Sequence, residues 1–217
     1  MVEKDVVLFD LDNTLYASDT GILEQMLNRH EAYICRVLNL NEQQAAEKRR
    51  DLYLKYGTTM YGMIKHHDIC PQDYMEFVYD VDVTSLNPCR ITKQYVESLP
   101  GRKFVFTNAS ATHARRVLEQ MDMADSFEDI FDTEWADFIP KPQVEPYHKL
   151  LAHLGQGGDT CAMFEDSPQN LEPAHALGMQ TILVGNTSVD APYIHHTAES
   201  LVQWAQETSQ TVKEQVA

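Results

Sequence analysis

Basic side chains are scarce in this chain of 217 residues, where 17 Lys and Arg stand against 33 Asp and Glu and the formal net charge is −16. Proteins that bind nucleic-acid polymers or anionic membranes rely on many Lys and Arg side chains to neutralise phosphates. We therefore expect neither a nucleic-acid polymer nor a membrane as a partner. A small phosphorylated substrate is compatible with this charge, because one lysine and one bound cation can reverse the local field.

Long apolar runs are also absent. No stretch reaches the ~18 apolar residues that a membrane-spanning helix needs. The first five residues are mostly charged and lead into only four apolar residues, which is not the pattern of a secretory signal. These absences predict a cytoplasmic location.

Closely spaced cysteines are missing as well. The four cysteines stand far apart and form no Cys-x-x-Cys pair: Cys35, Cys70, Cys89 and Cys161. Because zinc sites and disulfide frameworks show closer, paired spacing, these thiols are predicted to be free. The remaining composition, 43% hydrophobic and 23% charged, is typical of a globular protein.

Four short apolar runs predict strands that are buried on both faces, as in a parallel sheet. They cover residues 6–9, 103–107, 160–164 and 180–184. Apolar residues at helical spacing predict helices at 111–121, 144–154 and 168–177. The alternation of strand and helix from about residue 103 to 185 predicts a doubly wound α/β domain with a mostly parallel, Rossmann-like sheet.

Residues 16–90 follow a different pattern. Helices are predicted at 22–38, 42–56 and 72–79, and no strand is predicted among them. A helical insert after the first strand indicates a second, smaller domain. We therefore expect a discontinuous α/β core of residues 1–15 and 91–217, with a helical domain of residues 16–90.

Three predicted strands end in residues suited to phosphate chemistry. These are Asp10-Leu11-Asp12, Thr107-Asn108 and Glu165-Asp166, and Lys141 lies in the loop before the helix that leads to the third strand. Ligands of open parallel sheets bind at the carboxyl ends of the strands. Each feature alone has an ordinary explanation as a turn, a helix cap or a surface lysine. Their combination predicts one site.

The two aspartates after the first strand have distinct predicted roles. Asp10, at the strand end, is positioned to attack phosphorus and form an aspartyl-phosphate. Asp12, two residues later and on the same side, can protonate the leaving oxygen and then deprotonate the incoming water. Packed carboxylates would repel a phosphate dianion, so a hard cation is required and Mg²⁺ suits these oxygens. Its predicted ligands are Asp10, Asp12, Asp166 and Glu165, the last directly or through water.

The remaining residues of the predicted site handle the charge of the phosphate. Thr107 and Asn108, at the start of a helix where backbone amides face outward, are predicted to hold phosphate oxygens. The Lys141 ammonium is predicted to balance the extra charge of the five-coordinate transition state.

These residues resemble the four motifs of the haloacid dehalogenase-like hydrolases. The matching segments are residues 6–16, 106–109, 141–142 and 164–167 with Asn170, and the resemblance extends to about Gly185. It implies that the helical insert is a cap over the active site. The dehalogenases of this superfamily lack an aspartate at the position of Asp12, so Asp12 favours phosphoryl transfer. Phosphomutases share all four motifs and remain an alternative.

A narrower likeness is to the pyrimidine 5′-nucleotidase branch. It involves residues 10–16, 56–63 and 106–110, the last followed by His113. It implies hydrolysis of pyrimidine nucleoside monophosphates such as UMP or CMP. The chain differs from the frequent family pattern by having Glu165 before Asp166, which keeps a carboxylate. His66 and His67 are open to two interpretations, contact with a base or ribose and exposure to solvent.

Other functions are also compatible with the motifs. Within the superfamily, the substrate can be a sugar phosphate or a lysophospholipid phosphate. A different class is a phosphoryl-acceptor module similar to response-regulator receivers, although those are about half as long and lack the insert. A catalytically silent binding protein is a third reading. Steady phosphate turnover separates an enzyme from the last two.

Overall fold

A parallel sheet lies at the centre of the computed structural model, which describes residues 2–185 and 189–216. The described strands are β1 (Val6–Phe9), β2 (Arg102–Phe106), β3 (Asp129–Phe131), β4 (Cys161–Glu165), β5 (Gln180–Val184) and β6 (His196–Ala198). They form one sheet in the order β3-β2-β1-β4-β5-β6, and every pairing is parallel. The predicted doubly wound α/β fold is therefore confirmed.

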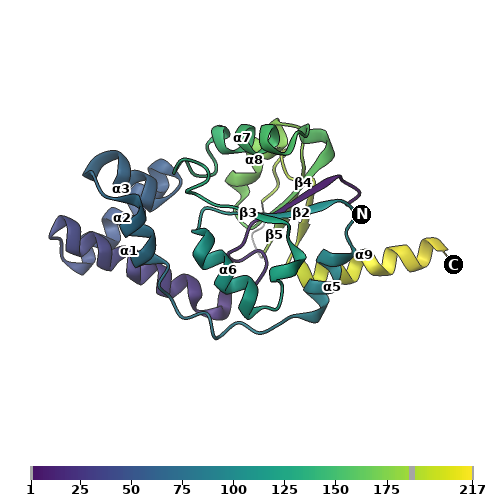
Figure 1. Cartoon of the computed structure of the whole chain (residues 1–217), viewed down its shortest axis with the longest axis horizontal. Coiled ribbons are helices and arrows are strands. Elements are labelled where there is room, and N and C mark those ends of the chain that lie inside the picture. The colour runs from purple at the N-terminus through teal and green to yellow at the C-terminus, as the bar shows by residue number, and fades with distance from the viewer. Residues whose placement is uncertain (1, 186–188, 217) are drawn as a thin grey trace.

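Helices cover both faces of this sheet and also form a separate group (Figure 1). The described α-helices are α1 (Ile22–Leu38), α2 (Glu42–Tyr56), α3 (Thr59–His67), α4 (Pro71–Val78), α5 (Arg90–Ser98), α6 (Ala111–Gln120), α7 (Val144–Leu154), α8 (Pro168–Ala176) and α9 (Leu201–Val216). Short 3₁₀ turns lie at Ser18–Thr20, Ala124–Ser126 and Gly158–Thr160. Helices α7 and α8 lie on one side of the sheet, and α5, α6 and α9 lie on the other.

The alternation of side chains along the strands explains the two layers of apolar packing. In β1, Val6 and Leu8 point to the face covered by α7 and α8, whereas Val7 and Phe9 point to the face covered by α5, α6 and α9. All four residues are buried. The strand therefore reads as a continuous apolar run, as expected for a central strand of a parallel sheet.

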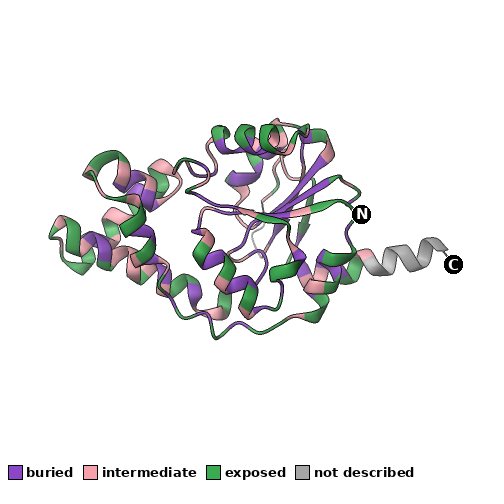
Figure 2. Ribbon diagram, viewed as in Figure 1, coloured by how far each residue is buried: buried purple, intermediate pink, exposed green. Residues whose placement is uncertain are grey.

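Helices α1 to α4 form a helical block at one end of the molecule, with an apolar cluster of its own (Figure 2). Tyr33 and Ile34 of α1, Leu52 of α2, Met63 of α3 and Tyr74 of α4 are buried in that cluster. The block interrupts the chain between β1 and β2 and contains no strand among its described residues.

The predicted elements were confirmed to within a residue or two, but several further elements were missed. Edge strands β3 and β6 are only three residues long and include exposed polar side chains such as Asp129, so they lack an apolar run. Helix α3 begins anew after Gly57, whose backbone is in the left-handed region and ends α2. Helices α5 and α9 were not predicted either.

All four cysteines are free. None of the helices in the described part of the chain has the length and apolar character needed to cross a bilayer.

Candidate active site

The carboxyl ends of β1 and β4 bring the predicted acidic residues together. These strands are neighbours, with Phe9 in register with Phe164, and the Asp10 amide donates to the Phe164 carbonyl at 2.9 Å. Asp10 therefore lies beside Glu165, the last residue of β4, and Asp166, which follows it. Residues far apart in the sequence meet here because the sheet order places their strands side by side.

Lys141 lies at the centre of this group and is buried, with 1% of its surface exposed. Its ammonium donates to Asp10 Oδ1 at 2.8 Å, to Glu165 Oε2 at 2.7 Å and to the Phe106 carbonyl at 2.7 Å. Burial disfavours the charged ammonium, but the carboxylates of Asp10 and Glu165 outweigh this effect and raise the pKa of Lys141 above its ordinary value. The lysine therefore stays cationic inside the protein.

The carboxyl groups have unusual proton affinities. Burial, with the charge of Glu165 adding and Lys141 opposing, raises the pKa of Asp10 from 3.8 to about 7. Burial raises the pKa of Glu165 from 4.5 to about 7 despite Lys141. Burial and the Asp10 charge raise the pKa of Asp166 from 3.8 to about 6. Burial is the largest cause of all three shifts, and the charge of Lys141 opposes it without cancelling it.

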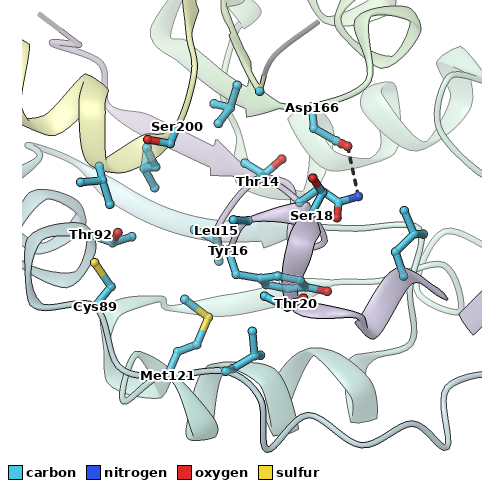
Figure 3. A pocket seen from close by; sticks show the side chains of 18 of the residues that line it. Thr14, Leu15, Tyr16, Ser18, Thr20, Cys89, Thr92, Met121, Asp166 and Ser200 are labelled. Atoms are coloured by element: carbon cyan, nitrogen blue, oxygen red, sulfur yellow. Dashed lines mark hydrogen bonds between the residues drawn. The ribbon is translucent and has the colours of Figure 1, made fainter. Parts of the chain in front are cut away.

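The donor set at this position fits a hard cation. Oxygen atoms of Asp10, Glu165 and Asp166 lie within 4.8 Å of one another, and carboxylate oxygens are the ligands that Mg²⁺ prefers. Asn170 lines the same cavity as Asp166, and no donor in the described part of the chain bonds to its buried Oδ1. The Asn13 amide donates to Asp166 Oδ2 at 3.3 Å (Figure 3). The uncompensated charge and the unpaired oxygen are both consistent with a magnesium site.

Asp12 lies outside that group of three carboxylates. Its Oδ1 accepts a hydrogen bond from His113 Nε2 at 2.9 Å and another from the Tyr16 hydroxyl. Its side chain is 18% exposed and lines a cavity next to Asp166. The predicted roles of Asp12 as acid and base, and metal ligation by its side chain, stay predictions.

The two residues predicted to hold phosphate follow β2. Thr107 is buried, and its Oγ1 accepts from the Ala109 amide at 3.0 Å. The Asn108 side chain spans the Lys141 backbone: Oδ1 accepts from the Lys141 amide at 2.8 Å, and Nδ2 donates to its carbonyl at 3.0 Å. Asn108 thus fixes the loop that carries Lys141, and phosphate contacts by both residues remain predictions.

A cavity of about 210 Å³ lies over these strand ends, between the sheet and the helical block. Its lining from the helical block and its connections comprises Leu23, Met26, Leu27, His30, Tyr53, Gly57, Thr58 and Tyr79. Asp12, Asn13, Asn108 and Asp166 are among the lining residues from the sheet side. No Lys or Arg lines it among the described residues, and neither His66 nor His67 does.

A larger cavity of about 640 Å³ lies beside the first and shares Asn13, Leu23 and Asp166 with it (Figure 3). Tyr16 lines this larger cavity, and its hydroxyl reaches Asp12. Sequence reasoning had assigned no role to Tyr16 or His113. The sequence did hold one sign of a role for His113. It lies beside Ala114 on the apolar face of the predicted helix, where a polar side chain needs a partner, and the structure shows that this face is buried.

The fold and the site define a parallel α/β protein with a carboxylate and lysine centre at the ends of its central strands. The chain belongs to the haloacid dehalogenase-like hydrolase family, whose model matches residues 4–178. It is 24% identical over 198 residues to Phosphate metabolism protein 8 of Saccharomyces cerevisiae. That match covers 83% of this chain and 61% of the yeast protein, so the chain spans only part of its relative's length.

Solved structures share the fold at low sequence identity. A HAD phosphatase from Thermococcus onnurineus has a TM-score of 0.62 at 16% identity, covering 94% of this chain and 97% of that one. The HAD-hydrolase YfnB of Bacillus subtilis, bound to magnesium, has a TM-score of 0.60 at 14% identity, covering 97% and 99%. The L-2-haloacid dehalogenase of Xanthobacter autotrophicus has a TM-score of 0.59 at 13% identity, covering 95% and 98%. Phosphatases and dehalogenases thus share this fold, and the fold does not separate them.

Proposed function

We propose that this hydrolase is a magnesium-dependent phosphatase that cleaves a small phosphate monoester through an aspartyl-phosphate at Asp10. The observation that carries the proposal is the buried Lys141 ammonium, 2.8 Å from Asp10, with the Asp12 carboxylate lining the adjacent cavity. A nucleophile, a charge-balancing cation and an acid are thereby available around one phosphorus position. Asp12 favours phosphoryl transfer over dehalogenation, which does not need a proton donor for an oxygen leaving group.

The proposed reaction has two steps. A carboxylate oxygen of Asp10 attacks phosphorus, the bond between phosphorus and the ester oxygen breaks, and Asp12 gives its proton to that oxygen. Asp12 then takes a proton from water, whose oxygen attacks phosphorus. The bond from phosphorus to Asp10 breaks, and inorganic phosphate leaves with the Asp10 carboxylate restored. Lys141 stabilises the additional negative charge in both transition states.

Magnesium belongs to this proposal because the donor set fits it. Asp10, Asp166 and Glu165, the last directly or through water, would hold the ion. When bound, Mg²⁺ would offset the repulsion between these carboxylates and the substrate phosphate.

The lining of the smaller cavity supports a leaving group without charge. Leu23, Met26 and Leu27 of α1 and Tyr53 of α2 offer apolar contact, and burial lowers the pKa of His30 to about 3, so its ring is neutral. A second phosphate would find no cation among these side chains. We propose a pyrimidine nucleoside monophosphate, UMP or CMP, as the substrate; its nucleoside is neutral.

The helical block is the proposed cap. It supplies about half of the cavity wall, and the Gly57 backbone comes so close to the loop after Lys141 that a Cβ there would lie 2.9 Å from Pro142. Closure of this block over bound substrate would exclude bulk water, and opening would release the products.

The test is phosphate release from UMP, CMP, a sugar phosphate and a lysophospholipid phosphate, with MgCl₂ or with chelator. We expect turnover only with magnesium, fastest on UMP or CMP, and none by Asp10→Asn. Asp125→Asn, at an exposed aspartate, is the matched control and should keep wild-type turnover. Preference for another ester would retain the mechanism and overturn the nucleotide proposal. No turnover of any ester would overturn the phosphatase proposal.

A further inference from the structure

Asp12 receives two hydrogen bonds on the same oxygen. His113 Nε2 lies 2.9 Å from Oδ1, and the Tyr16 hydroxyl also donates to Oδ1. No donor in the described part of the chain bonds to Oδ2. Since two donors already occupy Oδ1, a proton on Asp12 would reside on Oδ2, the oxygen left for a ligand in the cavity that Asp12 lines.

The surroundings of His113 define which tautomer makes this contact. The side chain is fully buried, and Nδ1 has no hydrogen-bond partner among the described residues. A carboxylate oxygen accepts hydrogen bonds, so Nε2 carries the hydrogen of this contact. The ring therefore acts as a fixed donor to the Asp12 carboxylate.

Helix α6 and the chain returning from the helical block hold this ring in place. Ser110 caps the helix by accepting from the His113 amide at 3.2 Å. The Tyr79 ring packs on the imidazole with centroids 5.2 Å apart. Arg116, one turn further along α6, donates to the Tyr79 carbonyl at 3.2 Å and to the Val81 carbonyl at 2.5 Å. The position of the donor is thus set by contacts on several sides.

We infer that His113 is a positioning residue for the reaction. Together with Tyr16 it occupies Oδ1 of Asp12, so that Oδ2 faces the substrate and carries the proton to the leaving oxygen. The inference rests on the proposed phosphatase activity and adds a residue for which sequence reasoning had no role. In this proposal the buried histidine has a role in the reaction in addition to its packing.

The test uses two esters that differ in how much their leaving group needs a proton. UMP releases an alkoxide, which requires protonation, whereas p-nitrophenyl phosphate releases a stabilised phenolate. For His113→Ala we expect kcat/KM on UMP to fall by about tenfold or more. The fall on p-nitrophenyl phosphate should stay within about threefold, with KM for both esters nearly unchanged. If another alkyl phosphate is turned over faster than UMP by the wild type, it takes the place of UMP.

Conservative variants distinguish a positioning role of His113 from a purely structural role. Gln at position 113 can offer an amide N–H near the place of Nε2, so His113→Gln should restore the ratio of the two kcat/KM values to within about threefold of wild type. Tyr16→Phe removes the other donor with little change of volume and should show the same selective loss on UMP. It keeps the test valid if His113→Ala fails to fold. Arg115→Ala, at an exposed position of α6, is the control and should leave both rates unchanged.

The outcomes are distinguishable. An equal loss on both esters, or no loss on UMP, in folded His113→Ala and in Tyr16→Phe would overturn the positioning role while leaving the phosphatase proposal intact. Absence of turnover on any ester by the wild-type protein would instead overturn the proposed function.

Discussion

Lys141 shows how strongly a single side chain can matter in this protein. Its ammonium donates to three oxygen atoms in a site from which water is nearly excluded. Removing one partner of a buried charged group leaves the others uncompensated, and such losses typically cost about 3–5 kcal/mol. Stability and the proposed catalysis therefore depend on the same atom.

Lys141→Met is expected to lower both activity and stability. Without the ammonium, Asp10 and Glu165 face each other without a counter-charge, so turnover should fall at least about a hundredfold. The free energy of unfolding should decrease by about 3 kcal/mol, measured by urea denaturation. Lys149→Met is the matched control, because its ion pair with Asp137 is largely exposed and its loss should leave the urea midpoint nearly unchanged. Turnover of Lys141→Met close to the wild-type rate would contradict the assigned role.

Magnesium affinity is expected to depend on pH near neutrality. The folded protein raises the pKa of Asp10 and Glu165 to about 7 and that of Asp166 to about 6. Between about pH 4 and 7 the metal-free folded state thus binds more protons than the unfolded state, and the stability contributed by these groups falls as pH rises. Magnesium binds the deprotonated carboxylates, so its stabilising effect should grow over the same range.

This dependence can be measured by thermal denaturation with and without MgCl₂ at pH 6 and pH 8, at matched ionic strength. The increase in Tm on adding MgCl₂ should be several degrees larger at pH 8. Equal increases at the two pH values would show that proton release does not accompany binding.

The sequence predicted that the residues of the site gather at the strand ends, but not the contacts between them. Asp10, Glu165 and Lys141 could be proposed because each follows or precedes a recognisable strand or helix. The bond between Asp12 and His113 could not, since it joins residues 101 positions apart and depends on how α6 sits against β1. A hydrogen bond of this kind leaves no local pattern in the sequence.

At the scale of elements, the contact between α2 and α3 depends on a glycine. A Cβ at Gly62 would lie 2.7 Å from Leu52 Cδ2 and 2.9 Å from Tyr56 Cδ2, distances that real side chains do not adopt. The two helices can approach this closely only because position 62 has no side chain.

Gly62→Ala is therefore expected to destabilise the protein by about 1–3 kcal/mol, measured by urea denaturation. The clash with α2 should outweigh the gain in helix propensity that alanine brings. Gly157→Ala is the control: its backbone conformation suits alanine, and the added Cβ would meet mainly the movable Asp159 carboxylate. An unchanged or increased stability of Gly62→Ala would mean that α3 shifts away from α2 at no cost.

Predictability from sequence at this scale depended on length and apolar pattern. The buried strands and the longer helices have clear periodicity, and α1, α2 and α7 were predicted with their observed bounds. Strand β6 consists of His196, Thr197 and Ala198 at the edge of the sheet, where pairing with β5 rather than hydrophobicity defines it. Such a strand exists only in the context of its neighbour.

On the scale of the whole molecule, the apolar clusters are arranged unequally. Two clusters share the strands of the sheet and are thereby coupled through the same backbone, as with Val7 and Leu8 of β1. The third belongs to α1 to α4 and contains no sheet residue. We therefore expect the helical block to unfold as a separate unit.

Native-state hydrogen exchange should reveal this unit. We expect the amides of α1 to α4 to exchange through an opening whose free energy is lower than that of β1 and β4 by about 2 kcal/mol or more. The measurement is mass spectrometry of peptides from both regions at increasing urea concentrations below the unfolding transition. A single opening free energy for both regions would show that the molecule unfolds as one cooperative unit.

The strand order is the part of the architecture that the sequence left open. A parallel sheet followed from the apolar runs and the intervening helices, but not the placement of β1 between β2 and β4. That placement depends on pairing between segments about a hundred or more residues apart, which periodicity cannot report.

The central position of β1 affects how the chain folds while it is being synthesised on the ribosome. Val6 pairs with Arg102 on one side and with Cys161 on the other. Strand β1 precedes both partner strands in the chain, so it cannot pair until they have been synthesised. At synthesis rates of about 5–20 residues per second, this wholly apolar strand stays without its first partner for roughly 5 to 20 seconds. The helical block, whose contacts are closer in sequence, can fold during that interval. The strand that precedes the proposed nucleophile is thus made before both of its partners and becomes enclosed only after β4 has been synthesised.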